Sequence, residues 1–356
     1  MGNVQPYPIC GFVPPYILSA IADSAIAKPD PVGEISRAAC KHTLQHGTSY
    51  ATQRHELCAR TQVSPPDAGR GFTPKYVLGA IAESKQSSKL WWQKRLHCQA
   101  SCKERSTIAM EPTISLERLR DQKESVHYKL SSTPDGYNNA FWDGEAQRMV
   151  FGDGDHITFD FLTDSLDVIA HELSHGFVQF SSPLEYASQS GALNESCADI
   201  FGSMVEQWHM HQSVDDADWI LGQTLFPVAF TGSALRTFKA GKAYKDDPIF
   251  KTDPQPKHMD DLYKGPNDRG GVHINSEIPN HAFYLATKSL GGSSWERAGK
   301  VWYKTMISGK IEPNCDFKTF ARATVDIAGE EFVDKSVQMA IRDAWVKVGV
   351  LAQTKI

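Results

Sequence analysis

The pattern of hydrophobic and polar positions changes character at about residue 165. Beyond it, apolar residues recur every three or four positions, as they do on one face of an amphipathic helix. This spacing predicts helices over 165–180, 191–211, 279–290, 294–307, 316–328 and 333–348. Before it, turns rich in glycine and aspartate separate short apolar runs such as 149–151 and 157–159, which predict the strands of a small sheet.

A segment of the N-terminal part is repeated. Residues 11–24 read GFVPPYILSAIADS and residues 71–84 read GFTPKYVLGAIAES, so nine of fourteen positions are identical. Each copy places a proline before an apolar stretch with helical spacing, which predicts a turn entering a short amphipathic helix. A helix start alone would explain one copy. Because the pattern occurs twice, we interpret it as a repeated docking element.

The charge balance and the hydropathy exclude two classes of protein. The 356 residues include 37 Lys and Arg against 42 Asp and Glu, a net charge of −5, which is not the basic footprint of a nucleic-acid binder. No uninterrupted apolar run approaches the roughly 18 to 20 residues of a membrane-spanning helix. We therefore expect a soluble globular protein of two or three domains, at roughly 100 to 200 residues per domain.

The cysteines and the N-terminus indicate in which cellular compartment the protein is made. Seven cysteines are scattered along the chain without a C-x-x-C pair, so we expect mostly free thiols. Residues 1–7 have no basic segment followed by an apolar stretch, as a secretory signal would. The sequence thus predicts cytoplasmic synthesis without a signal peptide, which leaves leaderless export open.

The strongest chemical motif is the pentapeptide HELSH at residues 171–175. Inside a helix, His171 and His175 lie one turn apart on the same face, where both imidazoles can reach one zinc ion. Glu172 then lies beside the position of a water molecule, where a general base is needed. The alternative is a surface helix that carries two histidines and a glutamate by chance.

A third ligand is predicted on the next helix. Glu195 and Asp199 are again four residues apart, so Glu195 can complete a His-His-Glu zinc site. Asp199 can accept the second N–H group of a ligating histidine. The alternative is an acidic first turn that the helix dipole favours.

These motifs together resemble the thermolysin-like zinc metallopeptidases, or gluzincins. The shared features are HELSH, nineteen intervening residues, and Glu195 within the pattern N-E-x-x-A-D. Further matches are YNNAFW at 137–142, FGDGD at 151–155, L-x-Y at 184–186 and D-x-G-G-V-H-I-N-S at 268–276. The resemblance covers residues 124–356. The Pro-Pro-Tyr segment at 14–16 is similar to the protealysin-like branch in its precursor form.

The resemblance implies an α+β, thermolysin-like fold with a small β-rich N-terminal part, a mainly helical C-terminal domain and the zinc site between them. Tyr186 and His273 would steady the oxyanion of the tetrahedral intermediate, and Asp268 would orient His273. The implied zinc ligands are His171, His175 and Glu195.

The resemblance also implies substrate contacts. Asn139 and Ala140 match the edge strand that pairs with an extended peptide, and Arg236 matches the arginine that holds a substrate carbonyl. An apolar pocket would favour cleavage on the N-terminal side of bulky hydrophobic residues, although ordinary core packing would explain each of its residues singly. The pocket residues implied are Phe159, Leu162, Val168, Leu221 and Leu235.

The sequence departs from the family at the calcium site and in the N-terminal lobe. Asp167, Glu206 and Asp218 match calcium ligands, but Ile220 and Gln223 stand where other members have glutamates. We therefore expect one weakly bound Ca²⁺ or none. The expected domains are a propeptide-like region over 1–110, a shortened β-rich lobe with the zinc-binding helix over 111–187, and a helical domain over 188–356.

The predicted function is a Zn²⁺-dependent neutral endopeptidase made as a proenzyme. Its predicted partners are peptide substrates and its own N-terminal segment, and neither nucleic acid nor membrane. Because the N-terminal lobe is short, the alternatives are a weakly active enzyme and a non-catalytic zinc protein that binds peptides.

Overall fold

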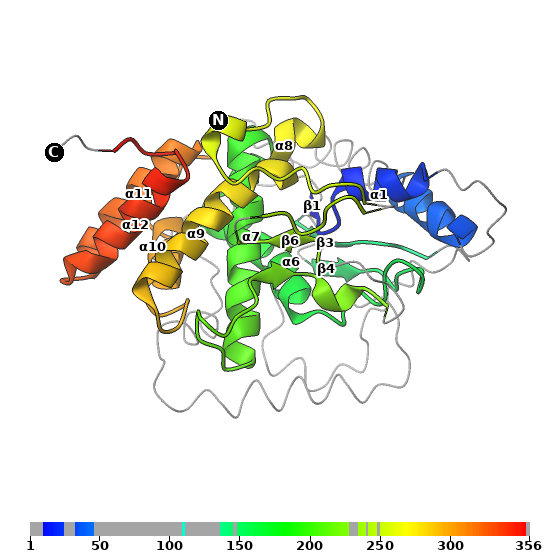
Figure 1. Ribbon diagram of the computed structural model, residues 1–356, viewed down its shortest axis with the longest axis horizontal. Coiled ribbons are helices and arrows are strands. Elements are labelled where there is room, and N and C mark those ends of the chain that lie inside the picture. The colour runs from blue at the N-terminus through cyan, green and yellow to red at the C-terminus, as the bar shows by residue number, and fades with distance from the viewer. Residues whose placement is uncertain are drawn as a thin grey trace, which may run out of the picture.

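The computed structural model describes residues 10–24, 33–45, 109–110, 136–144, 148–227, 234–239, 241–247 and 250–353. Two helices in its middle, α6 (Leu166–Ser181) and α7 (Ser188–His209), separate a small sheet from a group of C-terminal helices (Figure 1). The predicted division into a small β part and a mainly helical C-terminal domain is therefore confirmed. The second copy of the repeat, residues 71–84, lies outside the described residues.

The sheet joins segments from distant parts of the chain. Its order is β1-β3-β4-β2, and every neighbouring pair is antiparallel. Its strands are β1 (Cys10–Gly11), β2 (Ala109–Met110), β3 (Ala140–Asp143) and β4 (Arg148–Phe151). The strand predicted at 149–151 is thus confirmed. A second, two-stranded sheet pairs β5 (Ile220–Leu221) with β6 (Arg236–Thr237).

The strand predicted at 157–159 is wrong. This segment is a turn because one carboxylate oxygen of Asp155 accepts hydrogen bonds from the backbone N–H groups of Ile157, Thr158 and Phe159, at 2.9, 2.7 and 3.1 Å. Three successive donors directed at one oxygen require a curved backbone, which a strand does not have. The apolar run alone did not reveal this aspartate-centred turn.

The predicted helices after residue 165 are all present, with ends that differ by a few residues. Two of them begin at aspartates whose side chains accept backbone N–H groups, Asp316 from Thr319 at 2.7 Å and Asp334 from Ser336 at 2.9 Å. The bounds are α9 (Glu277–Leu290), α10 (Ala298–Met306), α11 (Phe317–Glu331) and α12 (Lys335–Lys347), with the 3₁₀ turns η1 (Gln223–Leu225) and η2 (Met259–Asp261).

The prediction missed α8 (Asp268–Asn275). Its first residues have left-handed backbone conformations, with φ values of 52° at Asp268, 51° at Arg269, 85° at Gly270 and 86° at Gly271. Such a start carries no helical periodicity, and glycine is the residue that adopts it without strain. A side chain at Gly271 would also collide with Tyr263, because its Cβ would lie 2.7 Å from that ring.

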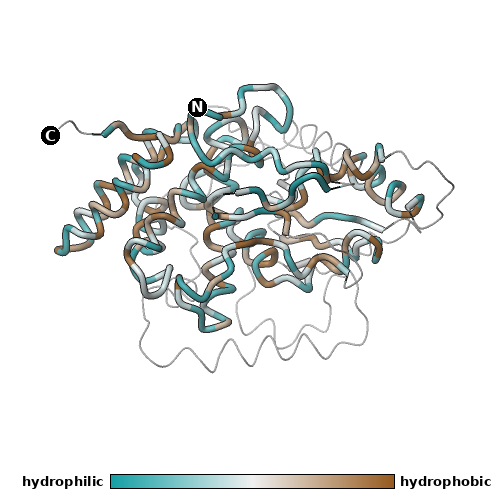
Figure 2. The backbone as a smooth tube through the Cα atoms, viewed as in Figure 1, coloured by the Kyte–Doolittle hydropathy of each residue, from teal (hydrophilic) through white to brown (hydrophobic). Residues whose placement is uncertain are grey.

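The helices beyond α8 pack around buried aromatic rings. Trp302 and Trp345 stack with their centroids 5.8 Å apart, and Phe320 meets Trp345 edge-on at 6.3 Å. Apolar and polar stretches follow one another along these helices (Figure 2). Buried residues recur at helical spacing, as Ala298, Val301 and Thr305 do in α10, so each helix presents one face to this core. No helix in the described part of the chain is long and apolar enough to cross a membrane.

The N-terminal elements pack on the sheet. After β1, the chain forms α1 (Pro15–Ala22), with Pro15 at its first position, and a further helix covers residues 33–45. That helix is tied to the sheet through Ser36 Oγ, which donates to Asp155 at 2.6 Å, and through Thr43 Oγ1, which accepts from the Asn138 N–H at 2.9 Å. The helix predicted in the first copy of the repeat is confirmed.

Close packing of α6 on α7 depends on Gly202. A Cβ at this position would lie 2.6 Å from the backbone oxygen of Asp167 on α6, closer than van der Waals contact allows. Because that oxygen belongs to a helix backbone, it cannot rotate away as a side chain would. Gly202 therefore lets the two helices approach closely.

We predict that Gly202→Ala lowers the free energy of unfolding by about 1–3 kcal/mol. Alanine is the better helix former by about 1 kcal/mol, so a loss of stability would show that the steric collision outweighs helix propensity. Urea unfolding followed by circular dichroism measures this. Val205→Ala, an exposed change on the same helix, is the control, and equal midpoints for the two variants would contradict the prediction.

Candidate active site

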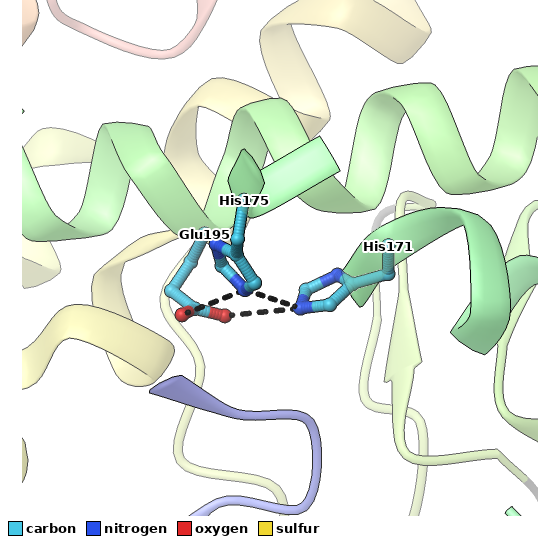
Figure 3. Close-up of side chains that lie close together, drawn as sticks. All are labelled: His171, His175 and Glu195. Atoms are coloured by element: carbon cyan, nitrogen blue, oxygen red, sulfur yellow. Dashed lines mark hydrogen bonds and ion pairs between the residues drawn. The ribbon is translucent and has the colours of Figure 1, made fainter. Parts of the chain in front are cut away.

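Three buried side chains from α6 and α7 converge on one point (Figure 3). The Nε2 atoms of His171 and His175 are 3.0 Å apart, and each lies 3.6 Å from an oxygen of Glu195. Their ligand atoms all lie within 4.8 Å of one another, and this is the only such group of His, Cys, Asp or Glu among the described residues. The predicted metal ligands are thus brought together.

The donor set fits a zinc ion. Two imidazole nitrogens and one carboxylate are a catalytic zinc set that leaves a position open. Burial lowers the pKa of His171 and that of His175 to about 4, so both rings are neutral near pH 7 and have a lone pair for a metal. Glu195 Oε2 is buried and makes no hydrogen bond with any described residue, although a metal ion would use it.

The other ring nitrogens are held by neighbouring side chains. His171 Nδ1 lies 2.9 Å from Asp199, and His175 Nδ1 lies 2.9 Å from the amide oxygen of Asn194. These contacts fix each ring with its Nε2 atom toward Glu195. The contact of Asp199 was expected, whereas that of Asn194 was not, although this residue directly precedes the third ligand in the sequence.

A buried ion pair holds Asp199 in place. Arg236 contacts one oxygen of Asp199 through Nε at 3.0 Å and Nη2 at 2.9 Å, and Asn280 donates to the other oxygen at 2.9 Å. Burial acts to raise the pKa of Asp199, but the charge of Arg236 and the hydrogen bond to His171 outweigh it and hold this pKa at about 2. Asp199 is therefore ionised at neutral pH.

Glu172 lies beside the first ligand on α6 and is fully buried. Its burial and, second, the negative charge of Glu195 raise the pKa of Glu172 well above its usual range. A carboxyl group with a raised pKa is a better proton acceptor than an ordinary carboxylate. The position and the chemistry both suit a group that takes up and releases a proton.

Tyr186 and His273 reach the same site from other elements. The Tyr186 hydroxyl donates to Glu195 and lies 3.3 Å from His273 Nε2. His273 Nδ1 lies 2.6 Å from Asp268. Burial acts to lower the pKa of His273, but Glu195 and Asp268 outweigh it and raise this pKa to about 9. His273 is therefore a cation that can donate a hydrogen bond toward the metal site.

The first copy of the repeat occupies the edge of the sheet beside this site. Gly11 pairs with Phe141 on β3, and the Phe12 N–H donates to the Ala140 carbonyl at 2.9 Å. The side-chain amide of Asn139 accepts from the Val13 N–H at 2.7 Å and donates to the Val13 carbonyl at 3.0 Å. The predicted peptide-binding edge is thus filled by an extended strand of the same chain.

Phe12 lies fully buried between the metal ligands and Arg236. Its ring meets the His171 ring edge-on with centroids 5.0 Å apart, and the Arg236 guanidinium lies 4.2 Å from its centroid. Arg236 Nη1 also donates to the Phe12 carbonyl at 2.9 Å, and His273 Nε2 lies 3.1 Å from the Gly11 carbonyl. Sequence reasoning did not single out Phe12, although the repeat carries phenylalanine at this place in both copies.

The five predicted pocket residues are buried in the same hydrophobic core as Phe12. Gly222 borders the pocket, because a Cβ there would lie 3.1 Å from the Phe12 ring and 3.4 Å from Leu235. Phe159 is also in ring contact with Phe226 and Phe250, at 5.7 and 6.4 Å. The role of these five residues in substrate binding stays a prediction.

Of the predicted calcium ligands, Asp167 accepts several hydrogen bonds from the protein in this structure. Asp167 accepts from the N–H groups of Val168 and Gly222, both at 2.7 Å, and from Ser165. Burial raises the pKa of Glu206 to about 8, and the nearby charges of Asp167 and Asp218 contribute. The three carboxyl groups therefore lie close enough together to interact. Weak calcium binding or none stays a prediction.

Two family models match the chain. Residues 117–179 match the thermolysin metallopeptidase catalytic domain, and residues 182–350 match the thermolysin metallopeptidase alpha-helical domain. Together they include most of α6, all of α7 and all three clustered ligands.

Individual proteins are similar over different lengths. An extracellular metalloprotease of Pectobacterium carotovorum subsp. carotovorum is 37% identical over 357 residues, which cover 96% of this chain and 97% of that protein. Protease PrtS of Photorhabdus sp. (strain Az29) is 48% identical, with 64% of this chain and 59% of that protein covered. Among solved structures, the precursor of protealysin, a metalloproteinase from Serratia proteamaculans, is 32% identical with a TM-score of 0.68 and covers 96% of this chain.

We predict that Asp199→Asn weakens zinc binding roughly 10- to 100-fold, because the neutral amide no longer polarises and orients His171 as a carboxylate does. Competition with a chelator of known affinity measures this. Asp326→Asn, an exposed change on α11, is the matched control. Equal zinc affinities in the two variants would mean that Asp199 does not act on the metal through His171.

Proposed function

The chain belongs to the thermolysin metallopeptidase family, and we propose that this metalloendopeptidase cleaves peptides before bulky hydrophobic residues and is kept latent by its own N-terminal segment. One observation carries the proposal. Gly11 and Phe12 lie along β3 with one carbonyl at His273, the next at Arg236 and the aromatic ring buried beside His171. An extended substrate would use the same contacts.

Each protein group near the Gly11–Phe12 bond suits one part of peptide hydrolysis. His171, His175 and Glu195 would hold a zinc ion, which would supply the Lewis acid that polarises the scissile carbonyl and lowers the pKa of water. Glu172 accepts a proton from the attacking water and passes it to the leaving amine nitrogen.

Tyr186 and His273 act on the carbonyl oxygen. Both are donors whose positions are already fixed, His273 by its contact with Asp268 at 2.6 Å. As negative charge develops on the carbonyl oxygen, hydrogen bonds from these groups strengthen, and a single such donor is worth roughly 3–4 kcal/mol of transition-state stabilisation. Asp268 orients His273, and its charge adds to that of Glu195 in raising the pKa of His273.

The latency rests on the exclusion of other peptides. As long as residues 10–13 pair with β3 and the Phe12 ring fills the pocket, no substrate strand can use that edge. The segment is anchored further by α1, whose Ile17, Leu18 and Ile21 are buried. Burial of three large apolar side chains stabilises this docked helix by about 1.5–3 kcal/mol each.

We predict that Glu172→Gln lowers the rate of peptide cleavage by about 100- to 10,000-fold, because it removes the proton acceptor. The zinc content stays unchanged, since no ligand is altered. Turnover of a quenched fluorescent peptide and metal analysis of the same sample measure both quantities. An unchanged rate would exclude Glu172 as the base, and His171→Ala, which should lose zinc, is the contrasting variant.

Cleavage before phenylalanine or leucine should be about 10- to 150-fold faster than cleavage before glycine. The difference corresponds to the burial of one large apolar side chain in the pocket that Phe12 occupies. A set of quenched peptides that differ only at this residue, with cut positions assigned by mass spectrometry, measures the preference. Equal rates for phenylalanine, glycine and aspartate would refute the apolar specificity.

We predict that the double variant Phe12→Asp/Phe72→Asp cleaves peptides at least ten times faster than the unaltered chain. Aspartate loses the apolar burial and would place a charge in the pocket, so the segment is released. Phe72 is changed as well because the repeat has phenylalanine there too. The matched control is Asp23→Asn/Glu83→Gln, at a position exposed in the first copy. Similar rates for all three folded proteins would contradict latency.

A further inference from the structure

The contacts of the first copy show which positions of the repeat matter for docking. Gly11 lies so close to Asn139 that a Cβ would be 2.5 Å from the amide nitrogen. Phe12 fills the pocket, and Pro14 precedes α1 as its N-cap. On α1, the side chains of Leu18 and Ile21 are buried. The docking contacts therefore depend on Gly11, Phe12, Pro14, Leu18 and Ile21.

The second copy has the same residue at every one of these positions. The equivalents are Gly71, Phe72, Pro74, Leu78 and Ile81. Identity at nine of fourteen positions therefore includes the glycine at the tight approach, the aromatic residue of the pocket and three of the four buried residues of α1, whereas the fourth, Ile17, becomes the smaller Val77. The first copy lies in a groove formed by the edge of β3 and the pocket that holds Phe12. Residues 71–84 have the side chains required to fill the same groove.

Two of the five differences between the copies fall at exposed positions, and a third preserves its backbone contacts. Pro15 and Asp23 are exposed in the first copy, and the second copy has Lys75 and Glu83 there. Val13 bonds to Asn139 through its backbone, so threonine at its equivalent position keeps both hydrogen bonds. The remaining changes are Ile17 to Val77 and Ser19 to Gly79.

Two of these changes make the second copy the weaker binder. Gly79 lowers the stability of the helix that the segment must form. Thr73 would bury a hydroxyl where Val13 buries a methyl group. The first copy should therefore occupy the groove whenever both copies are present, as it does in this structure.

The chain is long enough for the second copy to reach the place along β3 that the first copy occupies. Residues 85–108 connect the second copy to β2, which is three strand positions from β1 in the sheet. Neighbouring strands are about 4.8 Å apart, so β2 lies roughly 15 Å from the groove edge. A segment of 24 residues can extend up to about 80 Å. Attachment to the same chain also gives an effective concentration that is about millimolar for short linkers.

We propose that residues 71–84 form a second inhibitory segment, which occupies the groove along β3 when residues 11–24 leave it. The proposal rests on the inhibitory role of the first copy described above. Loss of the first copy alone then exchanges one occupant for another, and the active site becomes free only when both copies are removed or disabled.

The test measures occupancy of the groove by binding, in full-length zinc-loaded chains that carry Glu172→Ala so that nothing is cut. The probe is a fluorescent peptide with the sequence of residues 11–24, and its anisotropy reports binding. One chain carries Phe12→Asp, the second carries Phe12→Asp/Phe72→Asp, and the control carries Phe12→Asp/Glu83→Gln. Circular dichroism and melting temperatures establish that all three are folded.

The expected result is that the probe binds the Phe12→Asp/Phe72→Asp chain at least ten times more tightly than the Phe12→Asp chain. In the latter, the intact second copy competes for the groove, and the Glu83→Gln control should behave in the same way. Equal affinities for the first two chains, or no binding to either, would overturn the proposal. Because the readout is binding alone, an absence of proteolysis would count against the proposed function and not against this exchange.

Discussion

The buried ion pair between Arg236 and Asp199 connects the metal site with the peptide groove. A buried guanidinium requires a partner, and Asp199 supplies it while its contact with His171 orients a metal ligand. The same guanidinium donates to the Phe12 carbonyl and lies over the Phe12 ring. The position of a bound peptide and the orientation of the metal ligand therefore both depend on the charge of Arg236, which lies on the short strand β6.

The zinc site was predictable because its geometry follows from helix periodicity. The spacing of His171 and His175 within a helix fixes both rings on one face, and the structure places Glu195 on the neighbouring helix as the resemblance implied. The C-terminal helices were predictable for the same reason, since each has one apolar face. Their ends were less certain, because aspartate caps such as Asp334 act within one turn and leave little trace in the periodicity.

The parts that escaped prediction depend on contacts between distant residues or on local backbone geometry. The start of α8 is left-handed over four residues, and the turn at 157–159 forms around one aspartate, so neither has a hydrophobic period. The pairing of β1 with β3 joins Gly11 to Phe141, 130 positions later in the chain, and no local pattern encodes such a pair. The repeat did indicate a docking element, but the pairing of its first residues with β3 emerged only from the structure.

The sheet order has a consequence for the solubility of the protein. With β1 in place, the side of β3 that faces the active site has a hydrogen-bonded neighbour. Soon after β1, Pro14 and Pro15 end the extended segment, because proline cannot extend a ladder. A free strand edge invites pairing with other extended chains and thus aggregation. As long as it is paired, β1 therefore protects this side of β3 from other extended chains. Once β1 leaves, an extended chain that pairs with β3 would lie against Glu172 and the metal site. The enzyme would then cleave the chains that pair with this edge.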